Sequence, residues 1–179
     1  VGFLFQAFRL FDGLTALENV LLPFTFCSRT VSNTQRRDAT DLLKLHGVNP
    51  DTRSELLSRG EMQRTALVRV LMQSPSIILA DEPTASLDLA ARMETLHYVR
   101  DYARSRGTAV LMVSHDVNAA LEFCSDLVLV DPAGAVHGTS VASVTNDELS
   151  RTYGIPVTVR SLENHRFVCA GAPASRPRL

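Results

Sequence analysis

The stretch SIILADEPTASLD, Ser76–Asp88, decides the fold class of this chain of 179 residues. Its first part, Ile77–Ala80, is an uninterrupted apolar run that stops at an acidic residue, which is typical of a buried parallel strand. Downstream, Leu89–Arg106 has the pattern of a long amphipathic helix that ends at Gly107, and Thr108–Val113 is a second run typical of a buried strand. Because strands alternate with helices, the sequence predicts an α/β domain with a mainly parallel sheet.

The rhythm changes upstream of that stretch. Val1–Phe5 is predicted to be a strand, but Phe11–Leu57 shows helical patterns without an intervening buried strand. Two helix starts have the spacing of a capping box: Thr15 with Glu18, and Ser58 with Glu61. We therefore expect a helical subdomain inserted at about residues 11–74.

Shorter elements are predicted after residue 113. They are two helices and two strand pairs: Val117–Cys124, a helix capped by Thr145 and Glu148, strands through Val128 and Val136, and a hairpin of Val157–Arg160 with Arg166–Cys169. The chain is accordingly divided into an α/β domain at 1–147, a C-terminal helix plus hairpin at 148–170, and a frayed tail at 171–179.

The composition excludes several classes of protein. Hydrophobic residues make up 45% and the net charge is −1, so the chain has no basic excess and no nucleic-acid partner is expected. The longest apolar runs are far too short to span a bilayer. The three cysteines, Cys27, Cys124 and Cys169, are widely spaced, which argues for a reducing compartment and against a zinc site or a disulfide framework.

Polar side chains follow three predicted strands where each strand ends. Gln6 follows the first, Asp81 and Glu82 follow the second, and His115 follows the third. Ligands of open α/β sheets bind outside the carboxyl ends of the strands, so we expect these side chains to face one crevice. Taken singly, each is more often a cap, a turn or a structural residue; their joint order along the chain favours function.

These residues fit the division of labour in phosphoryl transfer, which is mostly positioning and charge stabilisation. Asp81 offers the hard oxygen ligands that Mg²⁺ prefers, and Gln6 could sense both the metal and the attacking water. Glu82 could act as a general base toward that water. His115 could donate a hydrogen bond to a γ-phosphate oxygen.

From Val1 to about Val130 the chain resembles the nucleotide-binding subunit of an ATP-binding cassette (ABC) transporter. Five motifs match in the family's order: Phe5-Gln6 with the following LFDGLTALENVLLP resembles the Q-loop, Leu57–Glu61 the signature, Ile77–Glu82 the Walker B strand, Ala85–Asp88 the D-loop and Ser114–Asp116 the switch-histidine loop. The resemblance implies a P-loop NTPase-like fold with an α-helical subdomain insertion, ATP and Mg²⁺ as cofactors, and ATP hydrolysis coupled to transport.

Two departures from the family pattern stand out. The signature is LSRGE where LSGGQ is common; Arg59 replaces a glycine, while Ser58 and Gly60, expected to contact a γ-phosphate, are kept. A helix N-terminus there favours an anion. The phosphate-binding G-x-x-x-x-G-K-[ST] loop is absent. We expect that this chain is the C-terminal portion of a longer protein and lacks the N-terminal part of the fold; a natural degenerate subunit is the alternative.

The resemblance also implies partners, because cassettes pair head to tail. Four residues would serve the nucleotide of a second cassette subunit: Ser58, Gly60, Glu61 and Asp88. Four would serve the chain's own nucleotide: Gln6, Asp81, Glu82 and His115. Transmembrane permease subunits would dock near Gln6–Leu22, placing the protein at the cytoplasmic face of the membrane as a peripheral subunit.

The C-terminal segment Glu148–Ala170 resembles the tail of importers for metal chelates such as iron-siderophore, haem or cobalamin. Two alternatives remain open: an ATPase of an amino-acid, phosphonate or lipoprotein-release system, and an impaired cassette that only presents its signature to a partner. A soluble cassette protein of DNA repair or translation is disfavoured, since the sequence shows neither long coiled-coil insertions nor tandem cassettes.

Overall fold

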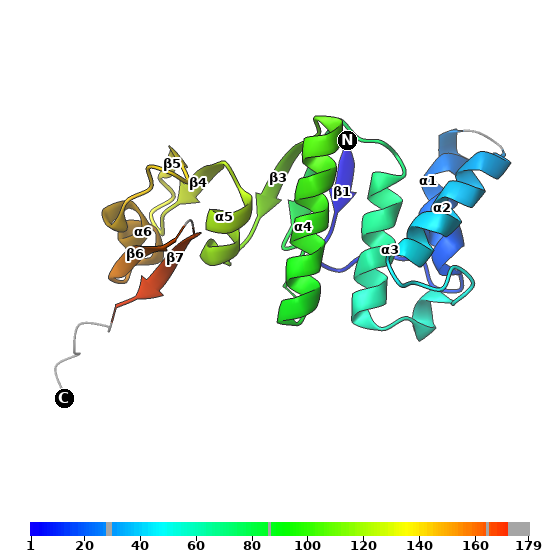
Figure 1. Cartoon of the computed structure of the whole chain (residues 1–179), viewed down its shortest axis with the longest axis horizontal. Coiled ribbons are helices and arrows are strands. Elements are labelled where there is room, and N and C mark those ends of the chain that lie inside the picture. The colour runs from blue at the N-terminus through cyan, green and yellow to red at the C-terminus, as the bar shows by residue number, and fades with distance from the viewer. Residues whose placement is uncertain (28–29, 86, 164, 172–179) are drawn as a thin grey trace. The chain divides into compact units, whose positions relative to one another are not determined.

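The computed structural model describes residues 1–27, 30–85, 87–163 and 165–171, and the chain forms two compact units, Val1–Val113 and Ser114–Leu179 (Figure 1). Of the predicted segments, Ser86 in the D-loop and the tail after Gly171 lie outside the described residues. No helix in the described ranges is both long and apolar enough to cross a membrane.

The first unit is built on a three-stranded parallel sheet. Its strands run in the order β1 (Gly2–Leu4), β2 (Ile77–Asp81) and β3 (Ala109–Val113). Leu4 lies opposite Ala80, and Ala80 lies opposite Met112, so the carboxyl ends of the strands reach the same edge. The parallel pairing confirms the α/β fold class that the sequence predicts.

The helices of this unit begin and end where the local sequence provides caps. They are α1 (Ala16–Cys27), α2 (Asn33–Leu45), the 3₁₀ helix η1 (Ser54–Leu56), α3 (Arg59–Leu71) and α4 (Leu89–Arg106). Both predicted capping boxes form, at Thr15 with Glu18 and at Ser58 with Glu61. Helix α4 has the predicted bounds, and Gly107 ends it at φ +64°, a conformation that glycine adopts without strain.

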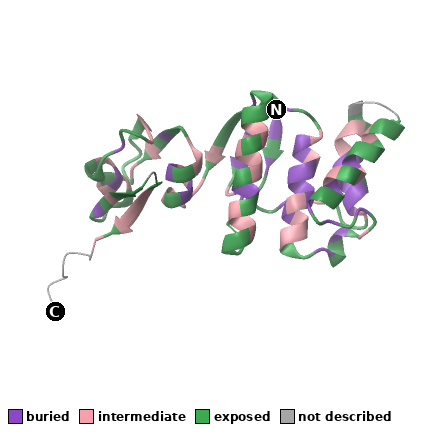
Figure 2. Ribbon diagram, viewed as in Figure 1, coloured by how far each residue is buried: buried purple, intermediate pink, exposed green. Residues whose placement is uncertain are grey.

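Helix α3 contributes to both hydrophobic clusters of the first unit. Ala66, Leu67 and Val70 pack with the sheet residues Leu4 and Ile78. On the same helix, Val68 packs with a second cluster that includes residues of α1 and α2. Figure 2 shows buried residues along much of α3. Any displacement of this helix would therefore disturb the packing on both sides.

The opposite face of the sheet is exposed, and here the prediction of a buried strand at Thr108–Val113 is wrong. Leu111 and Val113 are 59% and 58% exposed. Phe3, which shares that face with Leu111, is exposed too, and its ring stacks on Phe5 at 5.8 Å between centroids. A strand that is apolar on both sides is expected to be packed on both faces of the sheet. The described helices of this unit pack against only one face.

The second unit contains two antiparallel strand pairs and two helices. They are α5 (Val117–Phe123), β4 (Asp126–Val130) with β5 (Val136–Ser140), α6 (Asn146–Tyr153), and β6 (Val157–Leu162) with β7 (His165–Ala170). Both predicted hairpins are confirmed, and Val130 lies opposite Val136. The boundary predicted at 147/148 falls within α6, and that division stays a prediction.

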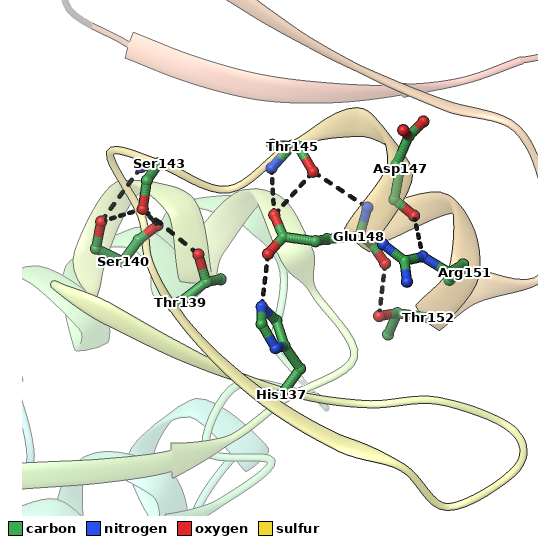
Figure 3. Close-up of polar contacts among 9 residues, drawn as sticks. All are labelled: His137, Thr139, Ser140, Ser143, Thr145, Asp147, Glu148, Arg151 and Thr152. Atoms are coloured by element: carbon green, nitrogen blue, oxygen red, sulfur yellow. Dashed lines mark hydrogen bonds and ion pairs between the residues drawn. The ribbon is translucent and has the colours of Figure 1, made fainter.

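Helix α6 is tied to β5 through its capping residues, as Figure 3 shows. Glu148 Oε2 accepts the Thr145 N–H at 2.7 Å, and Glu148 Oε1 lies 2.6 Å from His137 Nε2. The hydrogen bonds from Thr145, and then the contact with His137, lower the pKa of Glu148. The predicted cap at Thr145 and Glu148 is therefore confirmed, and Glu148 also links the cap to strand β5 through His137.

A buried histidine at the end of α2 predicts pH-dependent stability. His46 is 6% exposed, its ring meets the Tyr98 ring edge-on at 4.0 Å, and its Nε2 has no hydrogen-bond partner among the described residues. Burial lowers the pKa of His46 below its usual 6.5; Glu94 opposes this and Arg64 adds to it. The unfolded chain therefore binds a proton at this histidine more readily than the folded chain does. The free energy of unfolding should not depend on His46 above about pH 6.5 and should fall as the pH drops below that value.

The variant His46→Phe keeps an aromatic ring against Tyr98 and cannot titrate. In urea unfolding we expect wild type, but not His46→Phe, to lose stability between about pH 7.5 and about pH 5.5, above the range where carboxylates titrate. An equal loss in both proteins would show that His46 is not the responsible group.

Candidate functional site

The structure brings two predicted site positions to one edge of the sheet. Gln6 lies two residues beyond the end of β1, and Asp81 is the last residue of β2. Because Leu4 and Ala80 are register partners, both positions lie at the carboxyl edge of neighbouring parallel strands, and both side chains are exposed. His115 belongs to the second unit, so its participation at this edge stays a prediction.

Glu82, directly after β2, has a strained backbone. Its φ of +44° lies in the left-handed region, which costs a residue with a Cβ roughly 1–3 kcal/mol. The Glu82 N–H donates to the Val113 carbonyl at 3.0 Å, and its own carbonyl accepts the Ala85 N–H at 3.2 Å. The half-buried glutamate is thus fixed beside the end of β3. Strain of this kind persists only where surrounding contacts enforce it, and it is common at functional sites.

Ser58 and Glu61 close the N-terminus of α3. The Ser58 hydroxyl donates to Glu61 Oε2 at 2.7 Å and accepts the Glu61 N–H at 3.3 Å, while the Ser58 N–H donates to Oε2 at 2.9 Å. The hydrogen bonds from Ser58 lower the pKa of Glu61, so this carboxylate is charged at neutral pH. A phosphate approaching Ser58 would therefore compete with a carboxylate already at the helix N-terminus.

Gly60 is not required by the backbone of α3. Its φ lies outside the left-handed region, and an added Cβ would first meet Arg64 Nη1 at 3.3 Å, the end of a flexible side chain. We expect Gly60→Ala to leave the free energy of unfolding unchanged or to raise it by up to about 1 kcal/mol, since alanine favours helices.

The matched contrast is Gly107→Ala, which should destabilise by roughly 1 kcal/mol or more because Gly107 has φ +64°. Urea denaturation of both variants measures the difference. If Gly60→Ala is as destabilising as Gly107→Ala, the glycine has a structural role, and its proposed closeness to a phosphate loses this support.

The predicted Mg²⁺ site has no complete set of protein ligands. Among the described residues, no group of three or more His, Cys, Asp or Glu side chains could hold a metal ion. The Asp81 carboxylate and the Gln6 amide oxygen are hard donors, both exposed at one edge of the sheet. They fit an Mg²⁺ ion whose other ligands are phosphate oxygens and waters, which is how proteins usually bind it.

Asp88 caps helix α4. Its Oδ1 accepts the Ala91 N–H at 2.9 Å, and its side chain is exposed. This contact accounts for an aspartate at the position, because short acidic side chains are favoured N-caps. The predicted contribution of Asp88 to a partner's nucleotide stays a prediction.

The sequence interpretation missed two buried amides beside the site. Asn19 is fully buried; its Oδ1 accepts the Phe11 N–H at 2.7 Å and its Nδ2 donates to the Phe11 carbonyl at 3.2 Å. Gln63 of α3 is 1% exposed and donates from Nε2 to the Pro83 carbonyl, directly after Glu82. The available signal was a polar residue within an apolar helical run, as in ALENVLL.

The sequence interpretation also missed Arg69 of α3, which is a polar residue within the apolar run ALVRVLM. Its Nη2 donates to the Phe8 carbonyl and its Nη1 to the Arg9 carbonyl, both at 2.6 Å. These carbonyls belong to the loop that follows Gln6. The loop's conformation is therefore set from a helix about sixty positions away in the chain.

Comparisons with known proteins show the family of this chain. A family model described as ABC transporter matches residues 1–85. The phosphonates import ATP-binding protein PhnC 1 of Ruegeria sp. (strain TM1040) is 34% identical over 171 residues, 90% of this chain. This chain belongs to the ABC transporter ATP-binding family. It spans 66% of the length of that ABC protein.

Two solved ABC structures have the same fold. An ATP-binding cassette, described as a dimeric post-hydrolysis state bound to ADP and Pi, is 33% identical with a TM-score of 0.68, over 78% of this chain and 62% of that one. An inward-facing ABC transporter assigned to the metal-chelate type has a TM-score of 0.81 at 20% identity, over 98% of this chain and 72% of that one. The P-loop NTPase-like fold expected from the motifs is confirmed.

Proposed function

We propose that this chain is part of the ATP-binding subunit of an ABC transporter and hydrolyses ATP in a pair with a second cassette, most simply another copy. The proposal rests on the carboxyl edge of the sheet, where Gln6, Asp81 and the strained Glu82 lie at the ends of the neighbouring strands β1 and β2. It rests also on the family to which the chain belongs. The relative bound to ADP and Pi as a dimer supports both the nucleotide and the pairing.

The candidate site residues have separate tasks in this proposal. Asp81 and Gln6 would hold Mg²⁺, and the ion would supply positive charge against the phosphates. Glu82 accepts the proton of the attacking water. His115 donates a hydrogen bond to the γ-phosphate. Ser58 and Gly60, at the N-terminus of α3, contact the nucleotide held by the second cassette.

The proposed cargo is a metal chelate such as a siderophore, haem or cobalamin. Support comes from the helix and hairpin at Asn146–Ala170 and from the fold likeness to a metal-chelate-type transporter over 98% of this chain. Phosphonate is the rival, because of the relative PhnC 1. Permease subunits dock near Gln6–Leu22, where Phe11 is 55% exposed, and hold the protein at the cytoplasmic face of the membrane.

A second candidate is a cassette that only presents Ser58 and Gly60 to a partner. It requires that the complete polypeptide, like these 179 residues, contains no G-x-x-x-x-G-K-[ST] loop; the single lysine of the 179 residues, Lys44, lies in α2. Much of the phosphate binding in such proteins comes from that loop and its lysine.

ATP turnover by two proteins separates the candidates. One is the 179-residue chain, and the other is the complete polypeptide expressed from its own gene, with whatever residues the gene places before Val1. We expect weak or no turnover by the 179-residue chain. Strong turnover by that chain, abolished in Glu82→Gln, would show that no phosphate loop is needed; absence of hydrolysis by the complete polypeptide would leave only the second candidate.

A further inference from the structure

One helix contacts both loops that hold candidate catalytic residues. Ser58 caps the N-terminus of α3; Gln63 binds the Pro83 carbonyl next to Glu82, and Arg69 binds the loop after Gln6. At 1.5 Å per residue, Gln63 and Arg69 lie about 8 Å and about 16 Å along the helix from Ser58. A single element thus connects the end that faces a second cassette with the two loops that serve the chain's own nucleotide.

The contact at Gln63 is buried and specific. Its amide nitrogen donates to the Pro83 carbonyl, and the side chain is 1% exposed. Pro83 is also buried, so without Gln63 its carbonyl would lose a partner that water could not readily replace. Because Pro83 directly follows Glu82, which has φ +44°, the position of α3 constrains the backbone of the proposed general base.

The contact at Arg69 is charge-assisted and joins one side chain to two carbonyls. Its guanidinium donates to two successive carbonyls, of Phe8 and Arg9, at 2.6 Å each. Both residues adopt left-handed backbone, with φ of +57° and +50°. Burial lowers the pKa of Arg69, yet an arginine keeps its charge in proteins. A planar charged fork on two carbonyls is suited to holding a strained loop in one conformation.

Helix α3 can transmit a displacement because it is well packed. Seven of its residues are buried. Five of these belong to the two hydrophobic clusters that the helix contacts: Ala66, Leu67, Val68, Val70 and Leu71. Densely packed elements shift as units rather than deform locally. A change at Ser58 would therefore reach Pro83 and Phe8 through the helix.

We propose that Gln63 and Arg69 are positioning residues. Through them, α3 couples the binding of nucleotide at Ser58 to the conformations of the loops that hold Glu82 and Gln6. The proposal rests on the proposed function, in which Ser58 faces the nucleotide of a second cassette. Binding at that nucleotide would then adjust the residues that handle the chain's own. Each side chain acts through backbone carbonyls: Gln63 through that of Pro83, and Arg69 through those of Phe8 and Arg9.

The test uses amide NMR of the 179-residue chain without nucleotide. Ser58→Ala removes the N-cap of α3 and perturbs its first turn. In an otherwise wild-type chain we expect it to shift the amide resonances of both Arg9 and Thr84. In an Arg69→Gln background the shift at Arg9 should fall at least about threefold, while the shift at Thr84 is unchanged. In a Gln63→Leu background the shift at Thr84 should fall and the shift at Arg9 should be unchanged.

Arg104→Gln is the matched control, because Arg104 is an exposed arginine of α4, and it should change neither response. Should Arg69→Gln fail to fold, Arg69→Lys decides, since one ammonium cannot reproduce the fork on two carbonyls. We expect a reduced Arg9 response in Arg69→Lys. An undiminished response there, or shifts in wild type confined to the first turn of α3, would overturn the proposal.

No nucleotide enters this measurement, so its failure leaves the proposed ATPase function intact. Conversely, absence of ATP hydrolysis by the complete polypeptide would refute that function and leave the mechanical link between α3 and the two loops in place.

Discussion

Replacing Glu82 with glutamine is expected to lower ATP turnover by the complete polypeptide about 10²–10⁴-fold, the usual contribution of a general base. Glutamine has nearly the same size and meets the same backbone requirement, but its amide cannot accept a proton from the attacking water. ATP binding should change little, because Glu82 acts on the water rather than on the phosphates. Phosphate release at saturating MgATP and equilibrium binding of ATP measure the two quantities separately.

Glu122→Gln is the matched control for this variant. Glu122 is an exposed glutamate of α5, so the same chemical change there should leave turnover at the wild-type rate. If Glu82→Gln turns over ATP within about threefold of wild type, Glu82 is not the general base. The strain at its φ of +44° would then need another explanation.

Asn19→Ala is expected to lower the free energy of unfolding by about 2–4 kcal/mol, among the larger effects of a single truncation. The amide is fully buried and both accepts from and donates to the Phe11 backbone, and its Nδ2 also donates to the Thr15 carbonyl at 3.1 Å. Truncation leaves the part-buried Phe11 N–H without this acceptor and opens a cavity. Urea denaturation monitored by circular dichroism measures the loss.

Asn49→Ala provides the comparison, since the side chain of exposed Asn49 accepts a hydrogen bond from the Asp51 N–H at 3.1 Å. We expect it to cost less than about 1 kcal/mol. Equal losses in the two variants would mean that Asn19 does not anchor the segment between the Gln6 loop and α1.

Local signals in the sequence predicted the elements well. The bounds of α4 follow from a capping aspartate at Asp88 and a glycine at Gly107, and the capping box at Ser58 fixes the start of α3. Apolar runs located the three parallel strands. These features depend on neighbours within a few residues, which is why one sequence was enough to find them.

Features that depend on distant partners could not be predicted. Phe8 and Arg9 adopt left-handed conformations although neither is a glycine, so no local signal in the sequence predicts them. Their carbonyls accept hydrogen bonds from Arg69, about sixty positions away. The exposure of Leu111 also escaped prediction, because an apolar strand reveals a need for cover but not whether the cover is present. At Ser58 the capping box with Glu61 was predicted, but the additional hydrogen bond from the Ser58 hydroxyl to Glu61 Oε2 was not.

The central claim is that the Ser58 end of α3 in one copy completes the ATP site of another. Light scattering of the complete polypeptide carrying Glu82→Gln tests it most directly, since slow hydrolysis preserves the ATP-bound state. The account predicts that MgATP doubles the molecular mass, that ADP does not, and that adding Gly60→Asp abolishes the doubling by placing a carboxylate against the γ-phosphate. A protein that stays monomeric with MgATP, or a dimer indifferent to Gly60→Asp, would contradict it.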